Sequence, residues 1–220
     1  MAGRVALLKA ADSLLGRVAV PLAGLLRPAR PPAAIRSLLV IRPGGIGDAV
    51  LLIPALQAIG KRYPAAKITV LAERRNAAVF LLCPDVHHVL LYDRPAGLIA
   101  ALTGAFDAVV DTEQWHRLSA TVARMTRAGV QIGFATNERS RLLTHPVAYS
   151  QDDYEAESFL HLLAPLAIEP ERPARKFLTV PPRDVRTGEE LVAPLGDRVF
   201  VTMFPGASIP ERRWGADRFR

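Results

Sequence analysis

Short apolar runs alternate with segments of helical spacing from residue 37 to residue 134, and this alternation constrains the fold most. The run "SLLVIR" (37–42) is followed by the helical pattern of "DAVLLIPALQAIGKRYP" (48–64), which Pro64 ends. Uninterrupted apolar runs suit strands that are buried on both faces, and apolar residues three and four apart suit helices. Strands are expected at residues 37–42, 66–73, 86–93, 106–113 and 130–134. The intervening helices are expected at residues 48–64, 75–84, 95–105 and 117–129.

This order predicts an α/β fold with a Rossmann-like parallel sheet and helices on both faces. Right-handed crossovers then bring the carboxyl ends of the strands, and any ligand site, to one edge. Residues 135–150 are polar and basic without clear periodicity and are interpreted as a loop. Further along we expect a helix at 152–168, a strand at 175–182, a helix at 182–195 and a strand with a tight turn at 197–208.

The first 30 residues contain five basic side chains and a single acid, Asp12, a balance of +4. Leucine, alanine and valine recur there at helical spacing, at positions 7, 8, 11, 14, 15 and 18. Such a helix could lie on an anionic membrane surface or dock on the domain. Pro31 and Pro32 then mark a linker into the fold. We therefore expect an N-terminal extension at 1–34, a Rossmann-like domain at 35–195, and a third segment at 196–220.

The formal charge of +7 suits anionic partners such as phosphates, acidic glycans or lipids. It does not choose among them, although the sequence has no lysine-rich or aromatic-interleaved basic run of the kind that nucleic-acid binding favours. Cys83 is the single cysteine, which excludes a disulfide framework and fits a reducing compartment. No segment approaches the roughly 20 apolar residues that span a bilayer.

The glycine-rich stretch "RPGGIGDAV" (42–50) joins the first strand to the first helix, where backbone N–H groups often bind phosphate. A G-x-G-x-x-G fingerprint starting at Gly45 places Val50 where the third glycine belongs. A Walker loop is excluded because no G-K-[ST] follows. Glu73, at the end of the second strand, stands about where a ribose-binding acid would, so a nicotinamide-dependent oxidoreductase stays open as an alternative.

Asp48 lies in the first turn of the expected helix. There it can act as a cap or first-turn acid, which suits the helix dipole. A carboxylate beside ligand-admitting glycines can also remove a proton from a hydroxyl. The two interpretations are compatible, so Asp48 is a candidate general base.

Two motifs resemble glycosyltransferase family 9, the lipopolysaccharide heptosyltransferase family. The first is "SLLVIRPGGIGDAVLLIPALQAIGKRYPAAKITVLA" and the second is "FPGASIPERRW", more than 150 residues later. The segments "DTEQWHRLSATVARM" and "GFATNERSRLLTHPVAYS" are similar to a branch of the same family. The resemblance covers residues 37–220 and implies the GT-B architecture of two Rossmann-like domains. The chain would then contain the N-terminal, acceptor-side domain and the start of a truncated nucleotide-sugar-binding domain.

The resemblance implies inverting transfer of a heptose from ADP-heptose to the lipopolysaccharide inner core, with Asp48 as the catalytic base and no metal-binding D-x-D motif. Ser208 and Arg212 match donor-diphosphate contacts, although many members have lysine at the position of Arg212 and histidine at that of Phe204. An arginine still supplies the positive charge there, and fixed cations and backbone donors stabilise a leaving diphosphate. The expected donor-binding residues are Gly206, Ala207, Ser208, Arg212 and Arg213.

An acceptor rich in phosphates and carboxylates would suit arginines at the carboxyl edge of the sheet. The expected acceptor-side residues are Gly44, Gly45, Gly47, Arg139 and Arg141. The implied partners are a nucleotide-sugar donor and an anionic lipid-linked glycan, with no further cofactor, no metal and no nucleic acid. The implied location is the cytoplasm, with peripheral contact at the inner membrane through residues 1–30.

Residues 1–220 by themselves are expected to transfer sugar poorly, because the resemblance places half of the donor site beyond them. A non-catalytic domain that binds anions or glycans therefore remains a second alternative, alongside the oxidoreductase.

Overall fold

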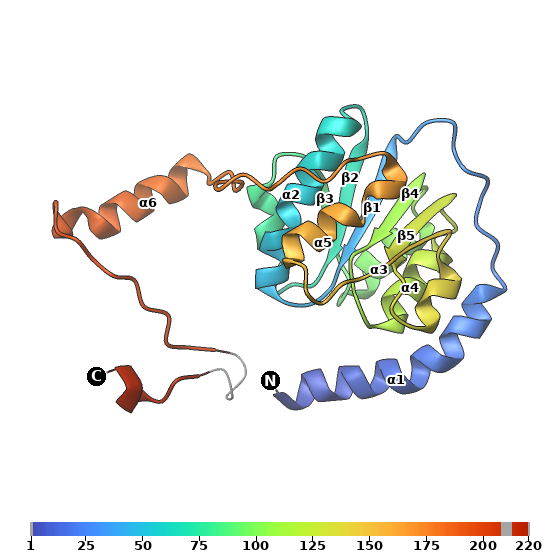
Figure 1. Cartoon of the computed structure of the whole chain (residues 1–220), viewed down its shortest axis with the longest axis horizontal. Helices are drawn as coiled ribbons and strands as arrows, with labels where there is room; N and C mark the ends of the chain where they lie inside the picture. The colour runs from blue at the N-terminus through green and yellow to red at the C-terminus, as the bar shows by residue number, and fades with distance from the viewer. Residues whose placement is uncertain (1, 208–212, 220) are drawn as a thin grey trace. The chain divides into compact units, whose positions relative to one another are not determined.

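The computed structural model describes residues 2–207 and 213–219, without the side chains of residues 2–11, 13, 216 and 219. The chain divides into a compact unit, Asp12–Thr179, and a second unit made of Met1–Ala11 and Val180–Arg220 (Figure 1). The domain boundaries expected at residues 34 and 195 stay predictions.

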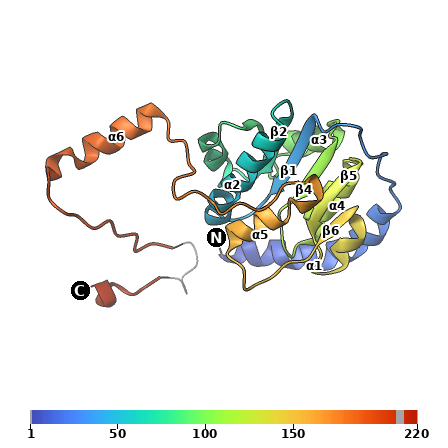
Figure 2. The ribbon, with the colours of Figure 1, turned by 45° about the horizontal axis from the view of Figure 1, so that its top comes forward.

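Six parallel strands form one sheet in the order β3-β2-β1-β4-β5-β6 (Figure 2). Their bounds are β1 Ser37–Arg42, β2 Lys67–Ala72, β3 Val86–Leu91, β4 Ala108–Asp111, β5 Val130–Phe134 and β6 His145–Val147. The five expected strands between residues 37 and 134 are therefore confirmed, and the register of β1 with β2 runs without a break from Ser37 opposite Lys67 to Arg42 opposite Ala72.

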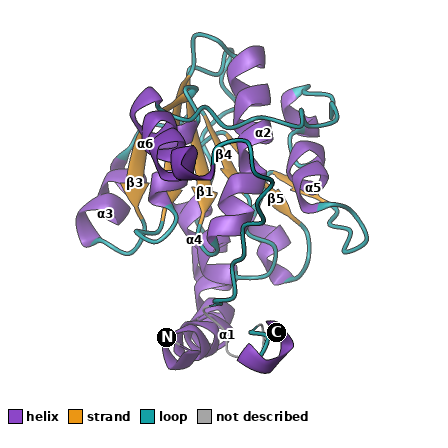
Figure 3. Ribbon diagram, turned by 90° about the vertical axis from the view of Figure 1, so that its left-hand side faces the viewer, coloured by secondary structure: helices purple, strands orange, loops and turns teal. Residues whose placement is uncertain are grey.

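Helices cover both faces of this sheet (Figure 3), as the alternating pattern predicts. The α-helices of the described residues are α1 Ala2–Gly24, α2 Ile46–Arg62, α3 Pro95–Thr103, α4 Arg117–Met125, α5 Glu155–His161 and α6 Pro182–Val192. Short 3₁₀ helices are η1 Ala77–Leu82, η2 Glu138–Leu142, η3 Ala164–Leu166, η4 Ala193–Leu195 and η6 Ala216–Phe219. Among the described residues, no helix combines the length and apolar character that crossing a bilayer requires.

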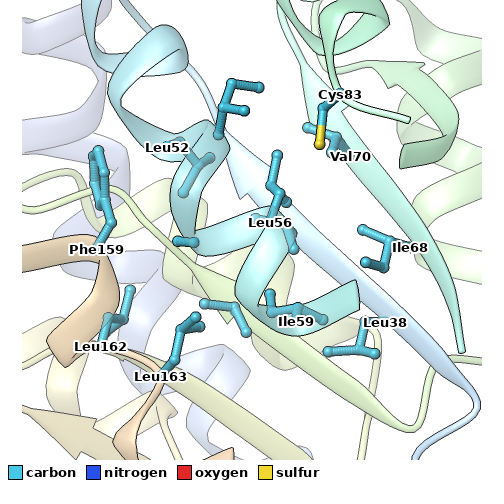
Figure 4. Close-up of a cluster of buried hydrophobic side chains, with 14 of the residues drawn as sticks. Leu38, Leu52, Leu56, Ile59, Ile68, Val70, Cys83, Phe159, Leu162 and Leu163 are labelled. Atoms are coloured by element: carbon cyan, nitrogen blue, oxygen red, sulfur yellow. The ribbon is translucent and has the colours of Figure 1, made fainter. Parts of the chain in front are cut away.

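Side chains of β1 alternate between two hydrophobic clusters, because successive strand residues point to opposite faces. Leu38 and Val40 join the larger cluster, which packs against α2, η1 and α5 (Figure 4). Leu39 and Ile41 join the smaller one, against α3 and α4. All four are fully buried. A central strand buried on both faces explains why its sequence is an unbroken apolar run.

Three predicted elements differ from the structure. Residues 75–84 contain the 3₁₀ helix η1 in place of an α-helix, residues 135–150 contain η2 and β6 in place of a loop, and residues 175–182 form no strand. In the last segment Thr179 donates its backbone N–H to the carbonyl of Leu82, but no strand pairs with it. A β-strand requires a hydrogen-bonded neighbour, which an apolar pattern alone does not supply.

In the second unit, the expected helix at 182–195 is confirmed as α6 followed by η4. The expected strand at 197–208 is absent from residues 198–207, and the side chains of residues 198–206 are exposed there. Arg213 donates from Nε to the carbonyl oxygen of Ala207 at 2.6 Å. Ser208 and Arg212, two of the expected donor-binding residues, lie outside the described residues.

Candidate functional site

The strand order reverses between β1 and β4, at the centre of the sheet. The chain leaves β1 toward β2 on one side and continues from β4 to β5 on the other. In open α/β sheets a crevice forms at the carboxyl ends of the two strands that flank such a point, and ligands bind there. The loops concerned are residues 43–45 and 112–116.

The glycine loop after β1 is fixed by polar contacts. Gly44 has φ +107°, a left-handed conformation that favours glycine. Its N–H donates to Oε1 of Glu73 at 3.2 Å, and its carbonyl accepts from Nδ2 of the buried Asn76 at 3.3 Å. Glu73, the residue expected to bind ribose in an oxidoreductase, therefore holds the loop and also pairs with Arg75.

Asp48 is the third residue of α2, whose N-cap is Gly45. It is thus the first-turn acid that the sequence predicts, and it is not the cap. A Cβ at Gly45 would lie 3.3 Å from Oδ2 of Asp48, so the glycine allows the carboxylate to fold back close to the loop. A Cβ at Gly47 would meet nothing within 4 Å, which leaves the space beside it open. The Asp48 side chain is 49% exposed and accessible to a ligand.

Arg42, the last residue of β1, is buried beneath this loop. Its Nε and Nη1 donate to the carbonyls of Pro43 and Thr112, at 2.8 and 2.9 Å. Its Nη2 lies 3.7 Å from Oδ2 of Asp48 and 3.4 Å from Oε2 of Glu113. One guanidinium therefore joins the loop after β1 to the loop after β4 and holds Asp48 at the point where they meet.

Glu113 is the buried acid of the second loop. Its Oε1 accepts from the backbone N–H groups of Gln114 and Trp115 and lies 2.9 Å from Nδ1 of His116. Burial by itself would raise the pKa of Glu113, but the hydrogen bond from His116 and the charge of Arg42 outweigh it and lower the pKa to about 2. Glu113 is therefore a permanently charged anchor at neutral pH.

The lowered pKa of Glu113 predicts that the free energy of unfolding decreases at acid pH. The folded pKa lies below the value of 4.5 for a free glutamate, so the stabilisation is present above pH 4.5 and is lost as the pH falls toward 2. A shift of this size corresponds to about 3 kcal/mol. In urea titrations at several pH values, Glu113→Gln should be less stable at pH 7 and should lose less between pH 7 and pH 3 than the unaltered protein.

The matched control is Glu171→Gln, because Glu171 forms an exposed ion pair with Lys61. It should follow the unaltered protein at every pH. Equal pH dependence in the Glu113→Gln variant and the unaltered protein would contradict the anchoring role.

Aromatic and polar side chains lie in and next to the loop after β4. Tyr149 donates its hydroxyl to Glu155 at 3.1 Å and meets Trp115 edge to face, with ring centroids 6.0 Å apart. Burial raises the pKa of Tyr149, and the negative charges of Glu155 and Asp48 raise it further. Both carboxylates therefore lie near enough to the Tyr149 hydroxyl to disfavour its ionisation. Trp115 is half exposed. The loops at the switch point thus carry an accessible carboxylate, Asp48, and a half-exposed aromatic ring, Trp115, which are groups that small-molecule sites use.

Arg139 does not lie where an acceptor-binding residue would. It is fully buried and forms an ion pair with Asp111, the last residue of β4. Its Nη1 also donates to the carbonyls of Glu113, Gln114 and Phe134. These contacts of Nη1 and Nη2 hold the loop after β4, so the expected acceptor contact is corrected to a structural one.

Arg141, two residues later, is exposed, and its contact with an acceptor stays a prediction. It lines a cavity of about 510 Å³ together with Arg17 of α1 and the paired side chains of Arg117 and Glu138. Gly206, Ala207 and Arg213 belong to the second unit and are exposed or partly exposed. Among the described residues, no group of three or more His, Cys, Asp or Glu side chains is arranged to hold a metal ion.

Arg42 and Glu113 are not among the site residues expected from the sequence. Both positions could have been noticed in the sequence. Arg42 is the last residue of the apolar run "SLLVIR", and Glu113 follows closely after the apolar run in "AVVDTE". In a parallel sheet such positions meet at the ligand edge. Their partnership required knowledge that β1 and β4 are neighbours.

The fold is similar to that of solved glycosyltransferases. A glycosyltransferase family 9 protein from Veillonella parvula aligns with a TM-score of 0.69 and 18% identity, over 87% of this chain and 60% of that one. Heptosyltransferase II of E. coli aligns at 0.62 and 18%, over 81% and 57%. E. coli heptosyltransferase WaaC with ADP aligns at 0.56 and 18%, over 64% and 50%.

The chain has the fold of glycosyltransferase family 9. The predicted Rossmann-like parallel sheet is confirmed, and its fold matches part of these glycosyltransferase structures. The chain spans between half and three fifths of the length of these three structures. No protein-family model matches the sequence, and no curated protein sequence matches it significantly.

Proposed function

We propose that the chain is the acceptor-side part of a family 9 glycosyltransferase, which transfers a heptose from ADP-heptose to the inner core of lipopolysaccharide. The observation that carries the proposal is the position of Asp48, a half-exposed carboxylate at the switch point of the sheet and against a buried guanidinium. The motif resemblance and the family 9 fold support it. The similar structures also support it, because two of them are E. coli heptosyltransferase WaaC with ADP and with ADP-2-deoxy-2-fluoro heptose.

The proposed reaction is a single displacement at the anomeric carbon. The acceptor hydroxyl oxygen attacks this carbon while Asp48 takes the hydroxyl proton. The bond between the sugar and the nucleotide diphosphate breaks, and the diphosphate leaves with the electron pair, so the anomeric configuration inverts. Arg42 and Glu113 position the base.

Asp48 suits this role because it is accessible and yet held in place. The first turn of α2 fixes its backbone, and Nη2 of Arg42 lies 3.7 Å from its Oδ2. A base that is already oriented before the acceptor binds lowers the entropic cost of reaching the reactive geometry. The exposed indole of Trp115 offers a flat apolar surface for a sugar ring at the same crevice.

The experiment that tests the proposal is a transfer assay with the full-length protein. ADP-heptose and a lipopolysaccharide acceptor that lacks inner-core heptose are incubated with it, and the product is followed by mass spectrometry. We expect a mass increase of one heptose and release of ADP. Binding of NAD(P) without any transfer would favour the oxidoreductase, and acceptor binding without transfer would favour a glycan-binding domain.

A further inference from the structure

The C-terminal part of α1 lies beside α4 (Figure 1) and is docked on the sheet domain by specific contacts. The carboxylate of the buried Asp12 accepts from the backbone N–H groups of Arg117 and Leu118 at 3.1 and 2.9 Å. These are the first two residues of α4, whose N–H groups have no partner within that helix. A Cβ on Gly16 would lie 2.7 Å from that of Arg117, so the glycine permits this close approach.

Packing continues one and two turns further along the same face of α1. Val20 and Ala23 form a small buried cluster with Ala120 of α4 and Leu142 of η2. Because Asp12, Gly16, Val20 and Ala23 share one face at helical spacing, the rotation of α1 about its own axis is fixed.

The opposite face of α1, which we call the outer face, is apolar and open to solvent. At 100° per residue its members lie on the side away from the docked residues. They are between 57% and 79% exposed. The outer face consists of Leu14, Leu15, Val18 and Leu22 of α1 together with Leu25, the residue that follows the helix. Exposed apolar residues that are scattered singly need no explanation, but a contiguous row of five indicates a binding surface.

The exposed charged side chains of residues 14–30 have one sign. Asp12 is the single acid among residues 1–30, and its carboxylate is buried against α4. The described basic residues of this segment, Arg17, Arg27 and Arg30, are exposed. Arg17 also faces the cavity of about 510 Å³ that Arg141 lines from η2. The segment therefore presents apolar side chains together with positive charge and no exposed negative side chain among residues 14–30.

We propose that the outer face of α1 docks on the surface of an anionic lipid bilayer. Apolar side chains would enter the boundary between headgroups and acyl chains, and the flanking arginines would contact lipid phosphates. A second copy of the chain fits this surface less well, because it would bring the same positive charges together. The proposal does not depend on the transferase activity.

Vesicle co-sedimentation of the full chain tests this docking. Vesicles of phosphatidylcholine alone are compared with vesicles that contain about 30% phosphatidylglycerol, a fraction at which the surface attracts basic segments. We expect binding to the anionic vesicles only, and a marked loss when salt is raised, because salt screens the attraction. The affinity of the triple variant Leu15→Ser/Val18→Ser/Leu22→Ser for anionic vesicles should fall by roughly tenfold or more. Leu81→Ser, at an exposed leucine of η1, is the matched control and should bind normally.

A site-directed label gives a second measurement that does not depend on the triple variant folding. Cys83 is buried, and burial raises its pKa to about 11, so it reacts little with maleimides at neutral pH. Val18→Cys and Leu81→Cys can therefore be labelled selectively with a polarity-sensitive dye. On anionic vesicles the emission should shift to the blue at position 18 and stay unchanged at position 81.

Three results would overturn the proposal. The first is equal binding to neutral and anionic vesicles, and the second is equal emission changes at positions 18 and 81. The third is a lipid-free dimer that the triple variant dissociates, which would assign the outer face to a second copy.

Discussion

Asp48→Asn should abolish nearly all turnover of the full-length protein while leaving acceptor binding within about twofold. General base catalysis contributes typically 10²–10⁴-fold to a rate, and an amide cannot take the proton of the acceptor hydroxyl. The side chain is half exposed and in the first turn of α2, so its replacement by an isosteric amide should disturb the fold little. Initial rates and acceptor titration calorimetry measure the two effects separately.

Asp93 provides the matched control. It follows β3 at the same carboxyl edge of the sheet and pairs with Arg74 at 3.8 Å, much as Asp48 lies 3.7 Å from Arg42. It lies away from the switch point, so Asp93→Asn should keep its turnover. Full activity of the Asp48 variant, or an equal loss in both variants, would remove Asp48 from the chemistry.

The second large effect is expected on stability, at Arg139. Arg139→Leu should lower the free energy of unfolding by about 3–5 kcal/mol, because removal of one partner leaves the other charge of a buried ion pair uncompensated. The charge that loses its counterion is the carboxylate of Asp111, which is fully buried. Burial raises the pKa of Asp111 and the charge of Arg139 lowers it, so without the arginine this carboxyl should take up a proton more readily. Urea unfolding followed by circular dichroism measures the loss.

Two further variants distinguish the loss of the ion pair from a nonspecific effect of replacing an arginine by leucine. Arg141→Leu changes the neighbouring exposed arginine and should alter stability by no more than about 0.5 kcal/mol, as most surface substitutions do. The double variant Asp111→Leu/Arg139→Leu removes both charges and should recover part of the loss. An Arg139→Leu protein as stable as Arg141→Leu would show that the pair is not essential to the fold.

Arg139 also illustrates a limit of reasoning from sequence. In "ATNERSRLL" it lies in a polar, basic stretch, where arginines are usually exposed. Its partner Asp111 is 28 residues earlier, at the end of another strand. The sequence does not reveal that η2 packs against the loop after β4, where Arg139 donates to the carbonyls of Glu113 and Gln114. Without that contact, Arg139 and Arg141 cannot be told apart.

The core of the sheet was predictable for a physical reason. Each of the first five strands is an apolar run followed by a helix or turn signal, and right-handed crossovers leave few ways to arrange such units. The same reasoning was wrong at residues 175–182, which form no strand. There the pattern is apolar, but the hydrogen-bonding partner that defines a strand is absent from the described residues.

The candidate site was predictable in part. Asp48 and the glycine loop follow from the first motif, and the positive φ of Gly44 explains one of its glycines. Arg42 and Glu113, which hold Asp48 in place, are 71 residues apart and meet only because β1 lies beside β4. Pairing of distant strands is information that a local pattern does not contain.

The central claim is that the crevice between the loops after β1 and β4 receives the acceptor. Nuclear magnetic resonance of the 220-residue chain tests it directly, by titration with a soluble, phosphorylated inner-core oligosaccharide. We expect saturable shifts of the backbone amides of residues 44–48 and 113–116, and the same shifts with Asp48→Asn. Shifts confined to other parts of the chain, with these amides unmoved at saturation, would contradict it.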